Sequence, residues 1–188
     1  MTMTRRSLVR LSLAVAPLVL LARPVLAAEQ QLVVDKARIV VESFLNDTEF
    51  ARMRVYVQNA YGVLIVPDLL KGGFIVGGQY GEGALLRSGR TAGYYSIAGP
   101  SLGFLAGAQA AGLAMFFMTE DALAALMASD GWEIGTGPSV VVLDRGVQAN
   151  LTTTTAAEPV YAITFNQEGL MAALALNGTK ITRINPSA

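Results

Sequence analysis

The fold is decided by a glycine-rich stretch, GVLIVPDLLKGGFIVGGQYGEGAL, at residues 62–85. Its first apolar run, residues 63–66, has the length of a buried strand, and Pro67 predicts that this strand stops there. Beyond Pro67, short apolar segments alternate with glycines as far as about Thr119. Glycines inside strand-like segments mark bulges, bends or close approaches of the backbone. Repeated through one sheet, they predict a strongly curved, barrel-like arrangement.

Further strands are expected wherever a short apolar run is bounded by turn residues. These runs are residues 74–76, 84–86, 94–97, 113–117, 139–143, 151–155, 160–165, 170–176 and 179–184. The last two runs are joined by Asn177-Gly178, and Asn-Gly between apolar runs is a strong hairpin signal. The tail of the chain, from residue 160 onward, is therefore expected to form an antiparallel meander.

The residues before the glycine-rich stretch predict a helical hairpin. Glycine and proline are absent from Ala28 to about Tyr61, and apolar side chains recur there at helical spacing. The side chains expected to face inward are Val33, Ala37, Val40 and Phe44 in a first helix, and Phe50, Met53, Val57 and Ala60 in a second. Residues 46–48 separate the two helices, and the second is expected to end at Gly62.

A third helix is expected over residues 122–129, behind Thr119 as the capping residue and with Glu120 and Asp121 in its first turn. No low-complexity linker interrupts residues 28–188. The expected fold class is therefore α+β, in one domain. It consists of an N-terminal helical hairpin packed on a strongly curved, mostly antiparallel, barrel-like sheet, with one further helix.

The first 27 residues have the features of a cleavable signal peptide. Three arginines precede an apolar run of 12 residues from Leu11 to Ala22, and the small residues Val25 and Ala27 predict cleavage after Ala27. A membrane-spanning helix needs about 20 apolar residues, so cleavage is favoured over a membrane anchor. We therefore expect a periplasmic or otherwise exported protein. Residues 4–10 resemble a twin-arginine signal, so the Sec route and the twin-arginine route both stay open.

Charge and composition exclude several classes of protein. The chain has 14 basic and 14 acidic residues, but four arginines lie in the signal peptide, so ten basic residues remain against 14 acidic ones, a net charge of −4. An acidic domain lacks the basic face that nucleic-acid binding requires. The chain has no cysteine and no histidine, which excludes disulfides, thiol catalysis, a Ser-His-Asp triad and the usual zinc ligands. Neither a cofactor nor a metal nor an enzymatic activity is expected.

Two glycine motifs are similar to motifs of enzymes. Residues 99–103, GPSLG, fit the pattern of a hydrolase nucleophile elbow around Ser101, which needs a strand-to-helix turn and a histidine base. A serine–lysine pair stays open, but a glycine-flanked turn in a curved sheet is the favoured interpretation. The glycines of residues 72–83 are as dense as in a phosphate-binding loop. Such a loop joins a strand to a helix, whereas this segment leads from strand to strand.

Five basic residues are the expected contacts for a lipid head group. Lys71, Arg87 and Arg90 lie on the expected loops around the glycine-rich strands, and Lys36 and Arg38 lie on the first helix. Lysine and arginine side chains beside an apolar, glycine-rich edge can bind anionic head groups. Ordinary solvated loop charges are the alternative interpretation.

Eight segments of the chain match one known family in the same order. They are GVLIVP (62–67), KGGFIVGG (71–78), GEGAL (81–85), YYS (94–96), PSLG (100–103), GAQ (107–109), GWEIG (131–135) and QEGLM (167–171). In these segments the chain resembles the SYLF (Ysc84-like) lipid-binding domain family in its exported bacterial form. One departure is Tyr95-Ser96, where eukaryotic members have tryptophan-serine.

The resemblance implies a single, non-enzymatic domain that binds phospholipids through basic residues and an amphipathic N-terminal helix. Actin binding, which belongs to eukaryotic members, is not expected of an exported protein. The expected partner is thus a phospholipid or a membrane surface in the bacterial envelope. One alternative is an envelope protein-interaction or scaffold module without lipid specificity. A hydrolase that uses Ser101 is the other.

Overall fold

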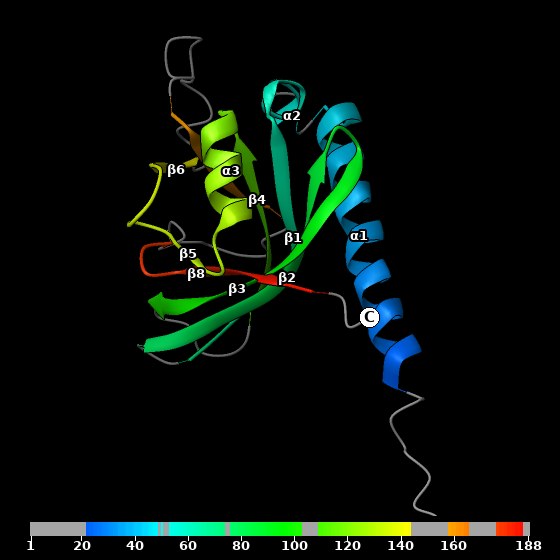
Figure 1. The fold of residues 1–188 in the computed structure, drawn as a ribbon, viewed down its shortest axis with the longest axis vertical. Coiled ribbons are helices and arrows are strands. Elements are labelled where there is room, and N and C mark those ends of the chain that lie inside the picture. The colour runs from blue at the N-terminus through cyan, green and yellow to red at the C-terminus, as the bar shows by residue number, and fades with distance from the viewer. Residues whose placement is uncertain are drawn as a thin grey trace, which may run out of the picture.

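The structure is a computed structural model that describes residues 22–48, 50, 53–73, 76–102, 109–143, 158–165 and 176–185. The elements in this part of the chain are α1 (Ala22–Asn46), α2 (Met53–Asn59), β1 (Gly62–Gly73), β2 (Val76–Arg87), β3 (Arg90–Leu102), β4 (Gln109–Phe117), α3 (Glu120–Ala128), β5 (Trp132–Glu133), β6 (Val140–Leu143), β7 (Val160–Phe165) and β8 (Lys180–Ile184). Figure 1 shows α1 on one side of a curled sheet and α3 on the other. The expected α+β class is confirmed.

The eight described strands form one sheet in the order β5-β8-β3-β2-β1-β4-β7-β6. Within the described residues the pairings are antiparallel, apart from the parallel pair β6–β7. The last strand, β8, pairs with β3 and β5, whereas β7 pairs with β4 and β6. The meander expected for the tail is therefore wrong. Gly178 does make a turn, with φ +75°, but this turn leads β8 to β3, a strand from the middle of the chain.

Pro67 bends β1 without ending it, contrary to expectation. The pairing of β1 slips by one residue between Ile65 and Asp68 on the β2 side, and between Val66 and Leu69 on the β4 side. One extra residue in a strand makes a β-bulge, and a bulge tolerates a residue without a backbone N–H. β1 therefore continues to Gly73.

The bulge brings the backbone of β1 against two glycines of β2. A Cβ atom at Gly81 would lie 2.7 Å from the carbonyl oxygen of Asp68, and one at Gly83 would overlap the carbonyl oxygen of Ile65. Only glycine permits so close an approach of two backbones. The glycine-rich stretch therefore does produce the strong curvature that its composition predicts.

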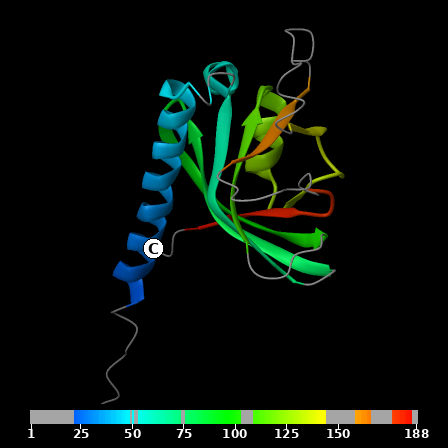
Figure 2. The same ribbon diagram turned by 180° about the vertical axis from the view of Figure 1, so that it is seen from behind.

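Each face of the sheet carries an apolar core. The inner face, toward which the sheet curls, packs against α3 and includes Leu64 and Leu123. The outer face packs against α1 and α2 and includes Ile65 and Phe44. Leu64 and Ile65 belong to different faces because successive side chains of a strand point to opposite sides. Figure 2 shows the same two layers from behind.

The N-terminal helical pair is confirmed, with local differences. Ala37, Phe44 and Met53 are buried as expected, and Val34 and Tyr56 are buried in addition. The remaining inward-facing candidates, Val33, Val40, Phe50, Val57 and Ala60, are half-buried. The second helix ends at Asn59 and not at Gly62, because Gly62 already belongs to β1 and pairs with β4. In the full chain α1 begins at Ala22, and it therefore continues through the predicted cleavage point after Ala27.

The third helix forms where it is expected. The side-chain oxygen of Thr119 accepts a hydrogen bond from the backbone N–H of Ala122 at 3.2 Å, which is the geometry of an N-cap. Most of the predicted apolar runs also coincide with strands. The runs at residues 151–155 and 170–175, and most of the run at 74–76, lie outside the described residues.

Candidate functional site

The five predicted basic residues fall in three separate places. Lys36 and Arg38 lie on α1, and Arg87 and Arg90 flank the turn between β2 and β3. Lys71 lies in strand β1 and not on a loop, which corrects the sequence interpretation. Along β2, eight residues separate Arg87 from the position paired with Lys71, or about 26 Å of strand. The structure therefore brings Arg87 and Arg90 together and places Lys71 far from them.

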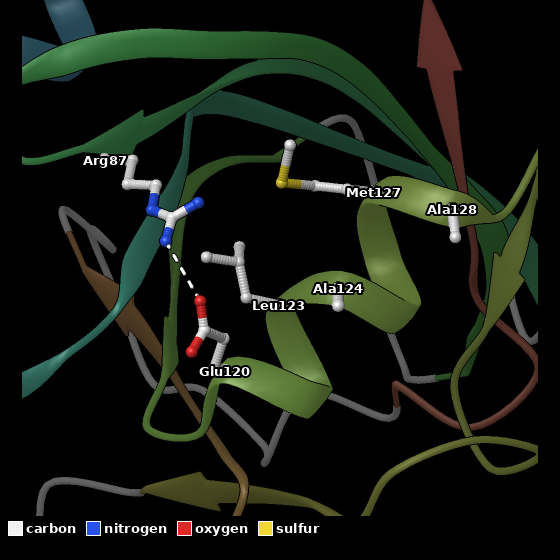
Figure 3. Close-up of a pocket in the computed structure, with 6 residues that line it drawn as sticks. All are labelled: Arg87, Glu120, Leu123, Ala124, Met127 and Ala128. Carbon is white, nitrogen blue, oxygen red and sulfur yellow. Dashed lines mark hydrogen bonds and ion pairs between the residues drawn. The ribbon is translucent and has the colours of Figure 1, made fainter.

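An open pocket of about 390 Å³ lies between the end of β2 and helix α3. It is lined by Arg87, Glu120, Leu123, Ala124, Met127 and Ala128, and is called the α3 pocket below. Figure 3 shows Arg87 on the strand and Leu123 and Met127 on the helix, facing the space between them. The pocket thus has an apolar wall and a charged rim.

The charge at the rim is an ion pair. Nη2 of Arg87 donates a hydrogen bond to Oε1 of Glu120 at 3.3 Å, as Figure 3 shows, and the two side chains are 47% and 68% exposed. Exposed pairs of this kind contribute only about 0–1 kcal/mol to stability. Because the pair is weak, another anion can take the place of Glu120 on Arg87.

A second arginine stands beside the first. Arg90 pairs directly with Arg87 in the β2–β3 ladder, across the tight turn at Ser88 and Gly89, both of which have positive φ. Like charges directly opposite one another destabilise a hairpin. Within the described residues, Arg87 forms an ion pair and Arg90 does not. Arg90 therefore lies directly across the hairpin from Arg87, the arginine that lines the pocket.

The opposite end of β2 contains a buried polar group on the inner face. Lys71 and Gln79 are direct partners in the β1–β2 ladder, and Nε2 of Gln79 donates a hydrogen bond to Oγ1 of Thr179 at 2.9 Å. Their exposed fractions are 6%, 4% and 0%. Leu69, two residues before Lys71, belongs to the inner core, so Lys71 shares the inner face. We call Lys71, Gln79 and Thr179 the inner polar row.

The ammonium group of Lys71 has no counter-charge within the row. Burial lowers the pKa of Lys71 below its ordinary value of 10.5. In the part of the chain that the structure describes, Lys71 forms neither an ion pair nor a side-chain hydrogen bond. A Cβ atom at Gly99 would lie 2.7 Å from Oγ1 of Thr179, so the glycine leaves room for the threonine.

The basic residues of α1 differ from one another. Nζ of Lys36 forms an ion pair with Oδ2 of Asp68 at 2.6 Å, which ties α1 to the bulge of β1. Arg38 is exposed. On the outward side of the same helix, Leu32 and Ile39 are 55% and 65% exposed. α1 therefore carries apolar side chains on its outside as well as toward the sheet.

The two enzyme-like motifs take other structures. Ser101 lies in strand β3 and pairs with Gly77, so its backbone is neither the strand-to-helix turn of a nucleophile elbow nor the glycine-flanked turn favoured from sequence. Residues 72 and 73 end β1, and residues 77–83 belong to β2, which together form a hairpin and not a phosphate-binding loop.

Neither a metal centre nor a membrane-spanning helix is found among the described residues. In that part of the chain, no group of three or more acidic side chains is placed to hold a metal ion. Likewise, none of the described helices is both long and apolar enough to cross a membrane.

Sequence reasoning predicted only Arg87 of the α3 pocket and only Lys71 of the inner polar row. Gln79 and Thr179 lie far apart in the sequence and meet only through the sheet, and Leu123 and Met127 were assigned only to a helix. A signal for the inner polar row was present: alternation from Leu69 puts Lys71 on the same face. Ending the strand at Pro67 hid this relation.

Comparison with known proteins finds one family match, which covers the second half of the chain. Residues 98–186 match the family model Ysc84, described as "Las17-binding protein actin regulator". A comparison with curated proteins finds no match. The five predicted basic residues all precede the matched range, which contains α3, β4, β8 and Thr179. The resemblance inferred from the sequence motifs is confirmed over residues 98–186, which match the Ysc84 (SYLF) family model.

Proposed function

We propose that this protein is exported and binds phospholipid in the bacterial envelope, without catalysing a reaction. The α3 pocket is the observation that carries the proposal, because it combines an apolar wall with Arg87 at its rim, and Arg90 lies directly across the hairpin from Arg87. A phospholipid has the same two parts, an anionic head group and apolar chains. The family match supports the proposal through the lipid binding that the resemblance implies.

In the proposed complex the lipid phosphate lies between Arg87 and Arg90 and displaces Glu120 from Arg87. This exchange replaces a weak exposed ion pair by charge-assisted hydrogen bonds to phosphate, for which the fork of an arginine is well suited. An acyl chain then covers Met127, Ala124 and Ala128, the apolar pocket residues that are exposed or half-buried. Each methylene group that leaves water there contributes about 0.8 kcal/mol.

Helix α1 provides a second, weaker contact with the membrane surface. Leu32 and Ile39 are exposed on its outward side, and Arg38, next to Ile39, is exposed as well. Apolar side chains beside a cation are the combination that interfacial helices present to anionic lipids. Lys36 contributes less to such a contact, because its ammonium group is paired with Asp68.

Vesicle flotation tests the proposal. The purified protein is expected to float with phosphatidylglycerol vesicles and to bind less with increasing salt. The double variant Arg87→Gln/Arg90→Gln is expected to bind about thirtyfold more weakly, since each basic residue near an anionic surface contributes about 1 kcal/mol. Its binding is also expected to depend less on salt. The parent protein and the variants have the same N-terminal apolar run. A difference in their vesicle binding therefore comes from the substituted arginines.

A matched control removes two arginines elsewhere. Arg54 and Arg183 are exposed, and neither lines the α3 pocket. Arg54→Gln/Arg183→Gln has the same net charge as the rim variant and is expected to bind nearly as well as the parent. If both double variants lose vesicle binding equally, the net charge of the protein explains the binding and the proposed site does not. Absence of binding to anionic and zwitterionic vesicles alike would falsify the proposal.

An envelope protein-interaction module is the second candidate, favoured by the exposed Leu32 and Ile39 on α1. Under this alternative, the protein captures an envelope protein and does not float with vesicles. Changing Arg87 and Arg90 would then leave the capture unchanged. The same two double variants therefore separate the candidates.

A further inference from the structure

We infer that the inner polar row is a second binding site, which takes a single anionic oxygen group, a phosphate or a carboxylate, on Lys71, Gln79 and Thr179. This site lies at the end of β2 opposite to the α3 pocket. It is therefore independent of lipid contact at Arg87 and Arg90.

Geometry places three polar side chains together. Direct partners in an antiparallel ladder hold their Cβ atoms about 4.5–5.5 Å apart, which puts the Lys71 and Gln79 side chains next to each other. The 2.9 Å hydrogen bond from Gln79 to Thr179 fixes the amide toward β8. The three side chains are more than nine-tenths buried. Packing within the protein therefore fixes the positions of these three side chains.

The row has more donors than acceptors in use. Lys71 offers three N–H donors, Gln79 has a second amide hydrogen beyond the one given to Thr179, and the Thr179 hydroxyl has a hydrogen of its own. A phosphate or carboxylate oxygen accepts several such donors at once, and hydrogen bonds between charged partners are the strong ones. An anion is therefore the ligand that this set of donors selects.

Energetics favour a ligand role for Lys71 over a structural one. A buried cation without a counter-charge is costly, and buried lysines are ordinarily paired. Burial also lowers the pKa of Lys71. The neighbouring row on the inner face consists of apolar residues and a glycine, among them Leu69, Ile97 and Ile181, so a methionine at position 71 would suit the surroundings better. A bound anion supplies the missing charge.

The low number of lysines allows a direct experiment. The chain has only three, Lys36, Lys71 and Lys180, so the protein labelled with ¹³C at the lysine side chains gives few Cε signals. Lys71→Met assigns the signal of Lys71. The probes are inorganic phosphate, acetate and dihexanoyl phosphatidic acid, each added to the full chain. We expect at least one of them to shift the Lys71 signal and to raise the pH at which it titrates, because an anion favours the charged form.

Lys36, which is paired with Asp68, and the exposed Lys180 serve as internal controls. Their signals are expected to stay in place while that of Lys71 moves. A response to inorganic phosphate or acetate identifies a free anion as sufficient, and a response to phosphatidic acid alone identifies a lipid head group. Equal shifts of all three lysines, or no shift of Lys71 at saturating concentrations of every probe, would overturn the inference.

The variant Lys71→Met provides a second readout. Loss of a charge-assisted hydrogen bond is expected to weaken binding of the responding probe about ten- to a hundredfold, measured by calorimetry. Arg87→Gln/Arg90→Gln is expected to leave this binding unchanged. If Lys71→Met does not fold, the titration of Lys71 in the parent protein still decides the inference. Vesicle binding lost only in the arginine variant, and anion binding lost only in Lys71→Met, would show that the two sites act separately.

Discussion

At one end of β2, Arg87 is about half exposed and lies 3.3 Å from Glu120, while at the other end Lys71 is 6% exposed and has no ion pair with a described residue. The two cations belong to neighbouring strands of one hairpin, and they differ in exposure to water and in ion pairing. Water screens Arg87, so its partner can be exchanged at little cost. Lys71 is largely shielded from water, so a missing partner there costs more. One sheet can therefore hold a weak, exchangeable anion contact and a selective buried one.

Apart from the inner polar row, the inner face of the sheet is apolar. The contrast between Arg87 and Lys71 depends on this. Leu123→Asp places a carboxylate where the side chain is 1% exposed, against the inner core. We expect a loss of about 3–5 kcal/mol in the free energy of unfolding, the range for an unpaired buried charge. Chemical denaturation measures it. Ala124→Asp, one position later and exposed, is the control and is expected to change stability by at most about 0.5 kcal/mol.

A gain in stability is expected at the other buried position. Lys71→Met removes the unpaired charge and keeps most of the side-chain volume, so in buffer without phosphate or carboxylates it should raise the free energy of unfolding by about 1–3 kcal/mol. Lys180→Met, at an exposed position, should change it by less than about 0.5 kcal/mol. A clear loss of stability in Lys71→Met would mean that the ammonium group has a structural partner.

The gain should depend on pH in a defined direction. Because burial lowers the pKa of Lys71, the unfolded chain holds more protons than the folded one between the folded pKa and 10.5. In that window the stability of the parent protein rises with pH relative to Lys71→Met. The advantage of the variant is therefore full below the folded pKa and shrinks as pH approaches 10.5. A difference that is constant from neutral pH to pH 10.5 would contradict this account.

The smallest effect is expected at the exposed pair. Arg87→Gln should lower the free energy of unfolding by only about 0.2–1 kcal/mol, and less at high salt, because both partners are exposed. Arg38→Gln, an exposed arginine without an ion pair in the described part of the chain, should have no measurable effect. A loss of several kcal/mol for Arg87→Gln would show that the rim is part of the folded framework and not an exchangeable contact.

Features that depend on near neighbours in the sequence were predictable. The spacing of Ala37 and Phe44 identified the inward side of α1, and Thr119 with two acids after it identified the start of α3. Glycine density predicted curvature, because the need for close approach at Gly81 and Gly83 is local to one hairpin. These signals depend on residues within a few positions of one another.

Features that depend on which strands meet were not predictable. Pro67 was interpreted as a stop because a missing N–H breaks an ordinary ladder, and only the register on both sides reveals a bulge. Asn177-Gly178 predicts the turn correctly, but it does not predict that β8 pairs with β3. The α3 pocket and the inner polar row both require segments from different parts of the chain. The residues that make up these two sites could therefore not be predicted from the sequence alone.

The hydrogen bond between Gln79 and Thr179 joins residues 100 positions apart. Closing a loop of that length costs about 4 kcal/mol of chain entropy, whereas one hydrogen bond contributes about 0.5–1.5 kcal/mol. The bond is therefore a consequence of the β3–β8 ladder and not its cause. Since the backbone sets the spacing of the row, exchanges among its side chains would alter affinity and selectivity without rebuilding the sheet. The arrangement separates the evolution of a ligand preference from the evolution of the fold.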